Sequence, residues 1–432
     1  MKRRALIAMA STASGGAALL AIAWLATRRL SPTELGFFFS FLSFGALVQL
    51  ADFGLTYASL QMGSLLSGTG RLSELASVAA RVRRWNLAAS GLATAMAGAI
   101  GSAIFSSNRS VIQSAGVTWH GPWAAFLVSV FLNQLTVPQM ALREGSGRVT
   151  QMWRLRLVQE WIAGAACLSA LHAGWGLWSL PAFAGVRGAT AAAWLAFGDE
   201  PLAGKGVSAY PLGRWMTEIW PFQWKIGVST LSGFLIFRAF SPIVLLEKGP
   251  VAAGSFGLAI SLMNLLISIS TAWPMSHAAR FSTLLAAGQN RKLRREFPRM
   301  LWGSTALSTA GTAALTFILW KAQDAGITFA LRLPDPVTTA LILLGASIHH
   351  VVACFAVVLR SEGREPLLAA SVAGGVVTVS AVWLASHFGS LRDVALANLA
   401  CTALGLPVVI YLFLGRRHLW VGPRERMIDP IR

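Results

Sequence analysis

Charged side chains inside otherwise apolar runs are the residues of this sequence that could do chemistry. Arg187 stands in the middle of the apolar run 177–197. An arginine at the centre of a bilayer costs about 2.5–3.5 kcal/mol on insertion scales, so Arg187 must face either a water-filled cavity or an acidic partner. In a cavity, its guanidinium would form charge-assisted, bidentate hydrogen bonds with phosphate.

Two carboxylates could bind a coupling ion or could instead be structural partners. Asp52 and Gln49 are three residues apart and share a helix face. Burial would favour the protonated form of Asp52, which could then carry a proton. Alternatively, Asp52 accepts backbone N–H groups or pairs with an arginine. Glu160 is the second candidate; we expect it to pair with Arg156, four residues earlier, and both carboxylates are possible partners of Arg187.

Four further basic residues are candidates for phosphate binding. Lys225 and Arg238 are thirteen residues apart in one apolar run, which places them about 140° apart around a straight helix, so that both cannot point into one cleft. Each could also extend along its stem to a membrane interface. Arg28 and Arg29 end the first apolar run and predict a cationic rim on the outer side, with extension into the interface as the alternative.

Polar uncharged residues and histidines complete the set of candidates. Asn264 could bind sugar hydroxyls or could hold helices together by hydrogen bonding. His349 and His350 are adjacent, and we expect at least one of them to face the interior of a helix bundle. Neighbouring residues on a helix point about 100° apart, so this pair cannot supply the ligand set of a metal, and no metal or other cofactor is expected.

The composition excludes a water-soluble protein. The chain has 432 residues, of which 55% are hydrophobic and 12% are charged, whereas soluble domains carry about 25% charged residues. Cys167, Cys354 and Cys401 all lie in apolar runs, which excludes a disulfide-stapled module. What remains is a polytopic membrane protein, whose net charge of +19 reports topology before it reports nucleic-acid binding.

Twelve apolar segments are long enough to cross a bilayer as helices of about 20 residues. They are continuously apolar rather than alternating, which argues against a membrane β-barrel. With the N-terminus in the cytoplasm, the basic clusters at 81–84 and 291–299 also fall on the cytoplasmic side, as does the C-terminal tail. We therefore expect no nucleic-acid partner. The predicted spans are 5–27, 37–60, 87–105, 122–141, 157–174, 177–197, 219–240, 251–274, 301–320, 337–359, 367–387 and 394–414.

An internal repeat divides the chain into two halves. A shift of 218 residues aligns Pro32 with Pro250 and Gly36 with Gly254. The offset corresponds to six helices, an even number, so that the halves run parallel, as in transporters that bind substrate between two repeats. We therefore predict an all-α polytopic membrane fold of two six-helix bundles. The bundles comprise residues 1–210 and 211–432.

Four segments resemble motifs of a known family. The segments 30–37 (LSPTELGF) and 51–55 (ADFGL) resemble the entry and the inner half of helix 2 in bacterial polysaccharide and O-antigen flippases. The segment 249–256 resembles the counterpart in the second half, and 274–295 resembles the segment that leaves helix 8. These flippases belong to the superfamily of multidrug, oligosaccharidyl-lipid and polysaccharide exporters, abbreviated MOP.

The resemblance implies a flippase rather than an enzyme. Such a protein moves a polyprenyl-diphosphate-linked oligosaccharide, an O-antigen or exopolysaccharide repeat unit, from the inner to the outer leaflet of the bacterial cytoplasmic membrane. It implies alternating access around a cationic cavity, coupling to a proton or sodium gradient, and polysaccharide polymerase and assembly proteins as partners. The candidate substrate ligands are Arg187, Lys225, Arg238, Arg28, Arg29 and Asn264, and the candidate coupling residues are Asp52 and Glu160.

Two other functions remain open. A cation-coupled multidrug exporter would share the architecture, but it would favour a more acidic and aromatic cavity than these basic residues provide. A membrane polysaccharide polymerase or ligase would need a large outer loop with catalytic Arg or His, and the predicted outer loops are short.

Overall fold

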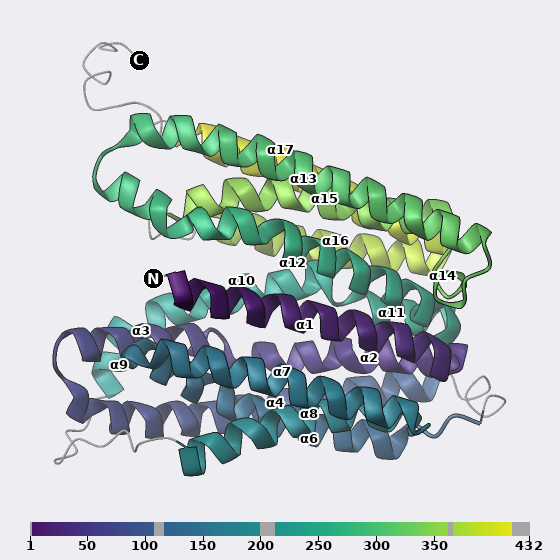
Figure 1. Cartoon of the computed structure of the whole chain (residues 1–432), viewed down its shortest axis with the longest axis horizontal. Coiled ribbons are helices and arrows are strands. Elements are labelled where there is room, and N and C mark those ends of the chain that lie inside the picture. The colour runs from purple at the N-terminus through teal and green to yellow at the C-terminus, as the bar shows by residue number, and fades with distance from the viewer. Residues whose placement is uncertain (1, 108–115, 199–211, 362–365, 417–432) are drawn as a thin grey trace. The chain divides into compact units, whose positions relative to one another are not determined.

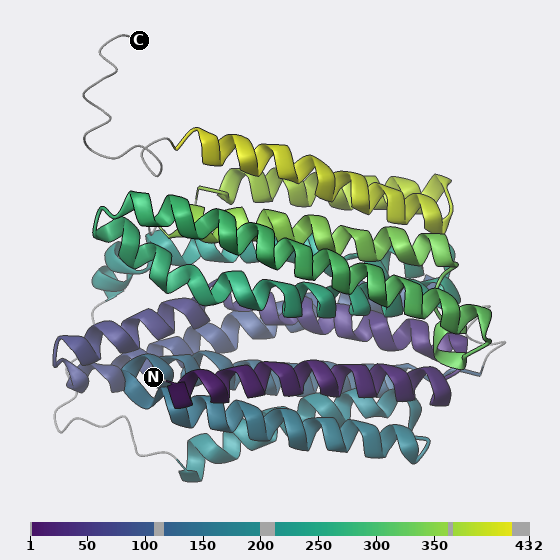
Figure 2. The same cartoon turned by 45° about the horizontal axis from the view of Figure 1, so that its top comes forward.

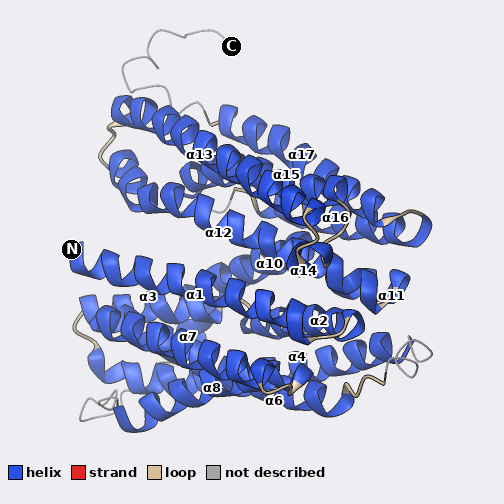
Figure 3. Ribbon diagram, turned by 45° about the vertical axis from the view of Figure 1, so that its right-hand side comes forward, coloured by secondary structure: helices blue, strands red, loops and turns tan. Residues whose placement is uncertain are grey.

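The computed structural model describes residues 2–107, 116–198, 212–361 and 366–416. All regular secondary structure in these residues is helical, and short turns connect the helices (Figure 3). The chain packs as two compact units, each with its own interior. Unit 1 comprises Met1–Phe234 and Arg238–Gly257, and unit 2 comprises Leu235–Phe237 and Leu258–Arg432.

Most helices belong wholly to one unit, whereas α10 and α12 each contain residues of both units. The helices are labelled in Figure 1. Unit 1 contains α1 (Lys2–Arg29), α2 (Pro32–Gln49), α3 (Leu55–Gly68), α4 (Leu75–Ser107), α6 (His120–Arg143), α7 (Val149–His172), α8 (Ser179–Ala193), α9 (Leu212–Glu218), most of α10 (Trp220–Phe237) and α11 (Phe240–Lys248). Unit 2 contains most of α12 (Pro250–Ala286), then α13 (Asn290–Asp324), α14 (Thr328–Leu331), α15 (Pro336–Arg360), α16 (Leu368–Phe388) and α17 (Leu391–Leu414).

Each predicted span overlaps a helix or helices joined by a short break, and the all-helical membrane fold is confirmed. By length and composition alone, six described helical segments could cross a membrane, or seven if the bent pair Gln223–Phe237 and Phe240–Lys248 counts as one span. One of the six segments, His120–His172, contains two predicted spans. The chain turns between them at Gly147, whose φ is +103°.

Local sequence signals set where the helices begin. At α2, the Ser31 hydroxyl accepts a hydrogen bond from the Glu34 N–H (3.2 Å), and the Glu34 carboxylate accepts one from the Ser31 N–H (2.8 Å). Pro32 occupies the first helical position, where its missing N–H is no loss. Ser390 and Asp393 form the same capping box at α17. Each cap satisfies backbone donors that would otherwise be unpaired at a helix start.

Aromatic side chains on α2, α4 and α6 fill the interior of unit 1. Phe37 and Phe41 lie 5.2 and 5.4 Å from Phe105 between ring centroids, and Trp123 lies 4.8 Å from Phe41. Aromatic pairs at such distances contribute about 0.5–1.5 kcal/mol each beyond their burial. Around this core, α1 packs on α7, and α8 packs on both α6 and α7. The contact between α1 and α7 is visible in two views (Figures 1 and 2).

Three helices of unit 2 also meet through phenylalanines. Phe297 of α13, Phe355 of α15 and Phe413 of α17 form a mutual triangle with ring centroids 4.9–5.4 Å apart. Phe297 and Phe413 belong to a buried cluster that includes Cys354 and Val358, and the partly buried Phe355 packs against this cluster. This cluster holds α13, α15 and α17 together at one end of the unit.

Glycines allow α2 to cross the first turns of α12 within unit 1. A Cβ on Gly36 would overlap the backbone carbonyl of Pro250, and a Cβ on Gly254 would lie 2.9 Å from the Gly36 nitrogen and 3.2 Å from the Pro32 oxygen. The repeat shift of 218 residues exchanges these two glycines and these two prolines. At this crossing, each glycine therefore faces the backbone of the other helix.

Candidate functional site

Arg187 has an acidic partner. Its Nη2 lies 2.9 Å from Oε1 of Glu160, which joins α8 to α7. A second contact joins the same two helices, because the Gln159 side-chain amide of α7 donates a hydrogen bond to the backbone carbonyl oxygen of Arg187 at 2.9 Å. The Arg187 side chain remains 37% exposed. A guanidinium has five N–H donors, so Arg187 keeps donors for a further anionic ligand.

Arg156 does not pair with Glu160, and that expectation was wrong. Its Nη2 lies 2.7 Å from Oε2 of Glu144 instead, and its guanidinium lies over the Trp153 ring at 4.9 Å. The cause is the turn at Glu144–Arg148, which brings the end of α6 beside the first turns of α7. Glu160 is then left for Arg187.

Asp52 lies where the second predicted span breaks between α2 and α3. Its Oδ1 accepts a hydrogen bond from the Gly54 N–H (3.0 Å), and its Oδ2 accepts one from the Thr56 N–H (3.1 Å). The break itself uses left-handed backbone, with φ of +47° at Phe53 and +81° at Gly54. Asp52 thus satisfies donors at the start of α3 that helical bonding leaves free. The sequence left open whether Asp52 pairs with an arginine or accepts backbone N–H groups. In the structure, its partners are backbone N–H groups.

The break packs directly on α10. A Cβ on Gly54 would lie 2.6 Å from the carbonyl oxygen of Gln223, and a Cβ on Gly227 would lie 2.5 Å from a ring carbon of Phe53. The Gln223 side chain is fully buried, and neither of its amide atoms has a hydrogen-bond partner among the described residues. Sequence reasoning missed this amide. The signal that could have found it is that Gln223 precedes Gly227 by four residues, on the helix that carries Lys225.

Lys225 and Arg238 are not brought together. Lys225 is exposed, with its ammonium 5.9 Å from the Trp224 ring centroid. Arg238 is the C-cap of α10, where the chain bends by 42° into α11. Thirteen residues of helix separate them by about 20 Å along the axis. Neither forms an ion pair with a carboxylate of the described residues.

Arg28 and Arg29 lie together at the end of α1. The Arg28 guanidinium lies over the Trp24 ring at 4.2 Å, and Nη2 of Arg29 lies 3.2 Å from Nδ1 of His172 at the end of α7. Glu160 lies on the same α7, about 18 Å from His172 along the helix axis. Arg29 on α1 and Arg187 on α8 are thus two basic positions on helices that both pack on α7. Asn264 is half-buried on α12 in unit 2.

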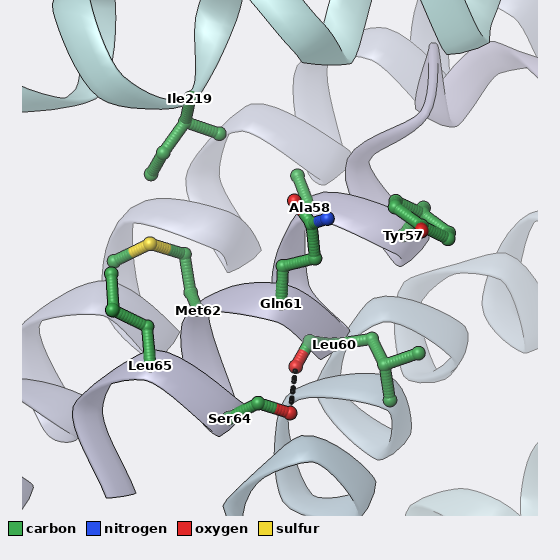
Figure 4. A pocket seen from close by; sticks show the side chains of 8 residues that line it. All are labelled: Tyr57, Ala58, Leu60, Gln61, Met62, Ser64, Leu65 and Ile219. Atoms are coloured by element: carbon green, nitrogen blue, oxygen red, sulfur yellow. Dashed lines mark hydrogen bonds between the residues drawn. The ribbon is translucent and has the colours of Figure 1, made fainter. Parts of the chain in front are cut away.

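A cavity of about 390 Å³ lies beside α3, within the usual size of small-ligand pockets. Its polar lining comes from Tyr57, Gln61 and Ser64, and Ile219 closes it from the segment before α10 (Figure 4). The Ser64 hydroxyl donates to the carbonyl oxygen of Leu60 at 3.1 Å. The described residues that line the cavity are uncharged, and three of them carry polar groups that can bind an uncharged polar ligand. No sequence pattern predicted this cavity.

Comparisons with known proteins rest on structure alone. No family model matches the chain, and no curated protein matches its sequence. An inward-facing multidrug resistance MATE family transporter of the MOP superfamily aligns with a TM-score of 0.68 at 12% identity, over 94% of this chain and 98% of its own. The two chains share one fold over nearly their whole lengths.

Two further solved structures share this fold. The lipid II flippase MurJ in an inward closed conformation aligns with a TM-score of 0.61 at 13% identity, covering 99% of this chain and 90% of its own. The Vibrio cholerae MATE transporter VcmN in its bent form aligns at 0.57 and 12% identity, covering 97% and 98%. All three alignments run nearly end to end, so the shared fold extends over almost the whole length of the chain.

Proposed function

We propose that this protein is a flippase that moves a polyprenyl-diphosphate-linked oligosaccharide from the inner to the outer leaflet of the bacterial cytoplasmic membrane. The observation that carries the proposal is the Arg187–Glu160 pair, a partly exposed guanidinium inside a membrane fold with donors left for a second anion. The polar head of such a lipid cannot cross hydrocarbon unaided. A partly exposed arginine offers it bidentate hydrogen bonds on the way.

In this proposal the diphosphate shares Arg187 with Glu160. A phosphate that binds the remaining N–H donors of the guanidinium would lie beside the Glu160 carboxylate, which is the proposed coupling residue at this pair. Substrate binding and ion coupling would thereby meet at one ion pair. Asp52 is the second proposed coupling residue, and there a proton would weaken the hydrogen bonds that start α3.

The remaining predicted residues would act along the path rather than at the ion pair. Arg28 and Arg29 would form a cationic rim at the end of α1, and Lys225 and Arg238 would bind phosphate at other depths. Asn264 would bind sugar hydroxyls. The neutral cavity beside α3 supports a sugar-bearing substrate, since its tyrosine, amide and hydroxyl groups match uncharged hydroxyl-rich rings.

The proposed setting follows from the same assignment. Residues 1–210 and 211–432 would be the two bundles that alternate access, with both termini in the cytoplasm. Polymerase and assembly proteins of an O-antigen or exopolysaccharide system would receive the product. The protein itself would perform no covalent chemistry.

A cation-coupled multidrug exporter is the second candidate. Two of the three similar structures described above are MATE transporters, and one of them has the higher TM-score of 0.68 against 0.61 for the flippase. Against this candidate, the intramembrane side chains that could meet a ligand are mostly basic, and they would repel a cationic drug.

A reconstitution experiment separates the two candidates. Proteoliposomes would carry a polyprenyl-diphosphate with one fluorescent hexosamine, and an external reductant would bleach the label that reaches the outer leaflet. The proposal predicts complete bleaching with the protein and half bleaching without it. A lipophilic cationic dye, assayed in parallel under an imposed pH gradient, should not be transported. Dye transport without lipid flipping would replace the proposal by the exporter.

A further inference from the structure

A buried histidine in unit 2 is not used by the proposed site. His350, in the middle of α15, has no exposed surface. Its Nε2 lies 3.0 Å from the Ser304 hydroxyl of α13 and 3.5 Å from the Cys354 thiol one turn along α15. Ser304 and Cys354 are themselves buried and lie 3.6 Å apart, Oγ to Sγ. The three side chains form a closed polar group between two membrane helices.

The second ring nitrogen of His350 is unmatched. Its Nδ1 is buried and has no hydrogen-bond partner among the described residues. A neutral imidazole carries one donor and one acceptor, and the Ser304 hydroxyl can serve Nε2 in either role. Whichever tautomer forms, Nδ1 is therefore left either as a bare acceptor or as an unpaired donor. Leaving such a group unpaired in a buried place costs free energy, and an apolar residue of similar size would avoid that cost.

A stripe of hydroxyl groups continues from this site along the same helix contact. Ser304, Ser308 and Thr312 are buried and recur every four residues on α13, which places them on one face. Ser347, one turn before His350, donates to the Thr312 hydroxyl at 2.9 Å. The contact between α13 and α15 is thus polar over several turns, in a span where apolar packing would suffice.

Among the described residues, no charged side chain contacts His350. On α15, the ionisable neighbours are Cys354 and His349, and the His349 ring packs edge-to-face on Phe237 at 4.5 Å. From α13, the side chain in contact is Ser304, and the charged residue nearest to it along α13, Arg299, is exposed. From α17, Asn398 lies near Gly345 and does not ionise.

We propose that His350 is a proton-binding site in unit 2 and that its protonation loosens the contact between α13 and α15. A second proton turns both ring nitrogens into donors. Ser304 can accept from Nε2, but the closed contact offers Nδ1 no acceptor among the described residues, so the protonated ring favours an arrangement that admits water or another partner. Resting on the proposed transport function, this places a second coupling step in unit 2, separate from Asp52 and Glu160.

The site can be tested by a measurement that requires no transported substrate. Protein labelled with ¹⁵N-histidine would be placed in phosphatidylethanolamine–phosphatidylglycerol nanodiscs, and the imidazole resonances would be followed from pH 8 to pH 5. The chain has seven histidines, and the variants H350Q and H349Q assign the two signals of interest. We expect the His350 resonances to move from neutral to protonated shifts in the wild type and in H349Q. His350 resonances that stay neutral at pH 5 would overturn the proposal.

Hydrogen exchange tests the conformational half of the proposal. After correction for the intrinsic pH dependence, amides of α15 around 347–354 should exchange at least about tenfold faster at pH 5.5 than at pH 8, in the wild type and in H349Q. H350Q should show no such change. Equal exchange at both pH values in the wild type would contradict loosening. Failure of lipid flipping with these responses intact would reject the proposed function and leave the proton site standing.

Discussion

Gly36 of α2 and Gly254 of α12 exclude side chains from the same crossing, with a Cβ on Gly254 only 2.9 Å from the Gly36 nitrogen. The repeat shift of 218 residues aligns Gly36 with Gly254 and Pro32 with Pro250. Gly36 lies against Pro250, and Gly254 lies against Pro32. Gly36→Ala should destabilise the protein by about 1–3 kcal/mol, because the added methyl meets the Pro250 backbone and not a flexible side chain.

The measurement is the unfolding midpoint in mixed detergent micelles. Gly311→Ala on α13 is the matched control, since nothing lies within 4 Å of its Cβ position. That control should be neutral or more stable, by up to about 1 kcal/mol, because alanine has the higher helix propensity. Equal stability of the two variants would show that the crossing is looser than described.

Asp52 can be tested with two substitutions that separate capping from ion coupling. Asp52→Asn keeps one oxygen for the Gly54 or Thr56 N–H, so the protein should reach the membrane at normal abundance. Asp52→Ala loses both bonds and should cost about 1 kcal/mol of stability. If Asp52 also carries a proton, the Asn variant should transport less and lose its pH dependence. Wild-type transport by this variant from pH 5.5 to 8 would end the coupling role.

The α12–α13 hairpin contains an ion pair with a defined pH response. Hydrogen bonds from Arg280 to Glu296, 2.5 Å each, hold the pKa of Glu296 below its ordinary value of 4.5. Because the pKa is lower in the folded state, the pair stabilises the hairpin above pH 4.5, and this contribution disappears as the pH falls through the folded pKa. The pair is exposed, so the effect should be small.

Hydrogen exchange across residues 281–295 would detect the change. Protection in the wild type should fall between pH 5 and pH 3.5, beyond the intrinsic change, and Glu296→Gln should show the lower protection throughout. The same pH response in both proteins would assign it to another group.

The proposed orientation can be tested with reporter fusions. Fusions after Gly68 and Gln289 should report a cytoplasmic location, and fusions after Gly249 and Asp335 a periplasmic one, because the basic loops remain inside. Two or more reversed signals would contradict the orientation.

The helices were predictable because continuous apolar runs of about 20 residues leave few alternatives. The break at Asp52 was not, since it depends on left-handed backbone at Phe53 within an apolar segment that also reads as an uninterrupted helix. The bend into α11 after Arg238 escaped for a similar reason. Periodicity describes a helix, but it does not show where tertiary contacts interrupt one.

The partners of the charged residues were likewise predictable only in part. Sequence alone identified Arg187 as needing a partner and named Glu160 as one of two possibilities, and the structure pairs them. The spacing of four residues also predicted a pair between Arg156 and Glu160, which was wrong. Spacing along one helix contains no information about the turn that brings Glu144 to Arg156. Gln223 and the environment of His350 became visible only in the packed structure, since their partners come from distant segments.

Substitutions at Arg187 separate a ligand from a structural ion pair. Arg187→Lys should keep part of the activity, because charge survives and only the bidentate geometry is lost. Arg187→Glu should be the most damaging, since it faces Glu160 and repels an anionic head group. If the arginine only joins α7 to α8, these variants should lose abundance instead, and Glu160→Arg should restore Arg187→Glu to the membrane.

The most direct test of the account is outer-leaflet exposure of the labelled polyprenyl-diphosphate sugar by Arg187→Gln, normalised to the amount of folded protein. Glutamine keeps a polar donor and removes the charge. A charge-assisted hydrogen bond contributes about 1.5–3 kcal/mol, so flipping should fall roughly 10- to 100-fold at normal abundance. Flipping at the wild-type rate by this variant would remove Arg187 from the substrate path and contradict the proposed mechanism.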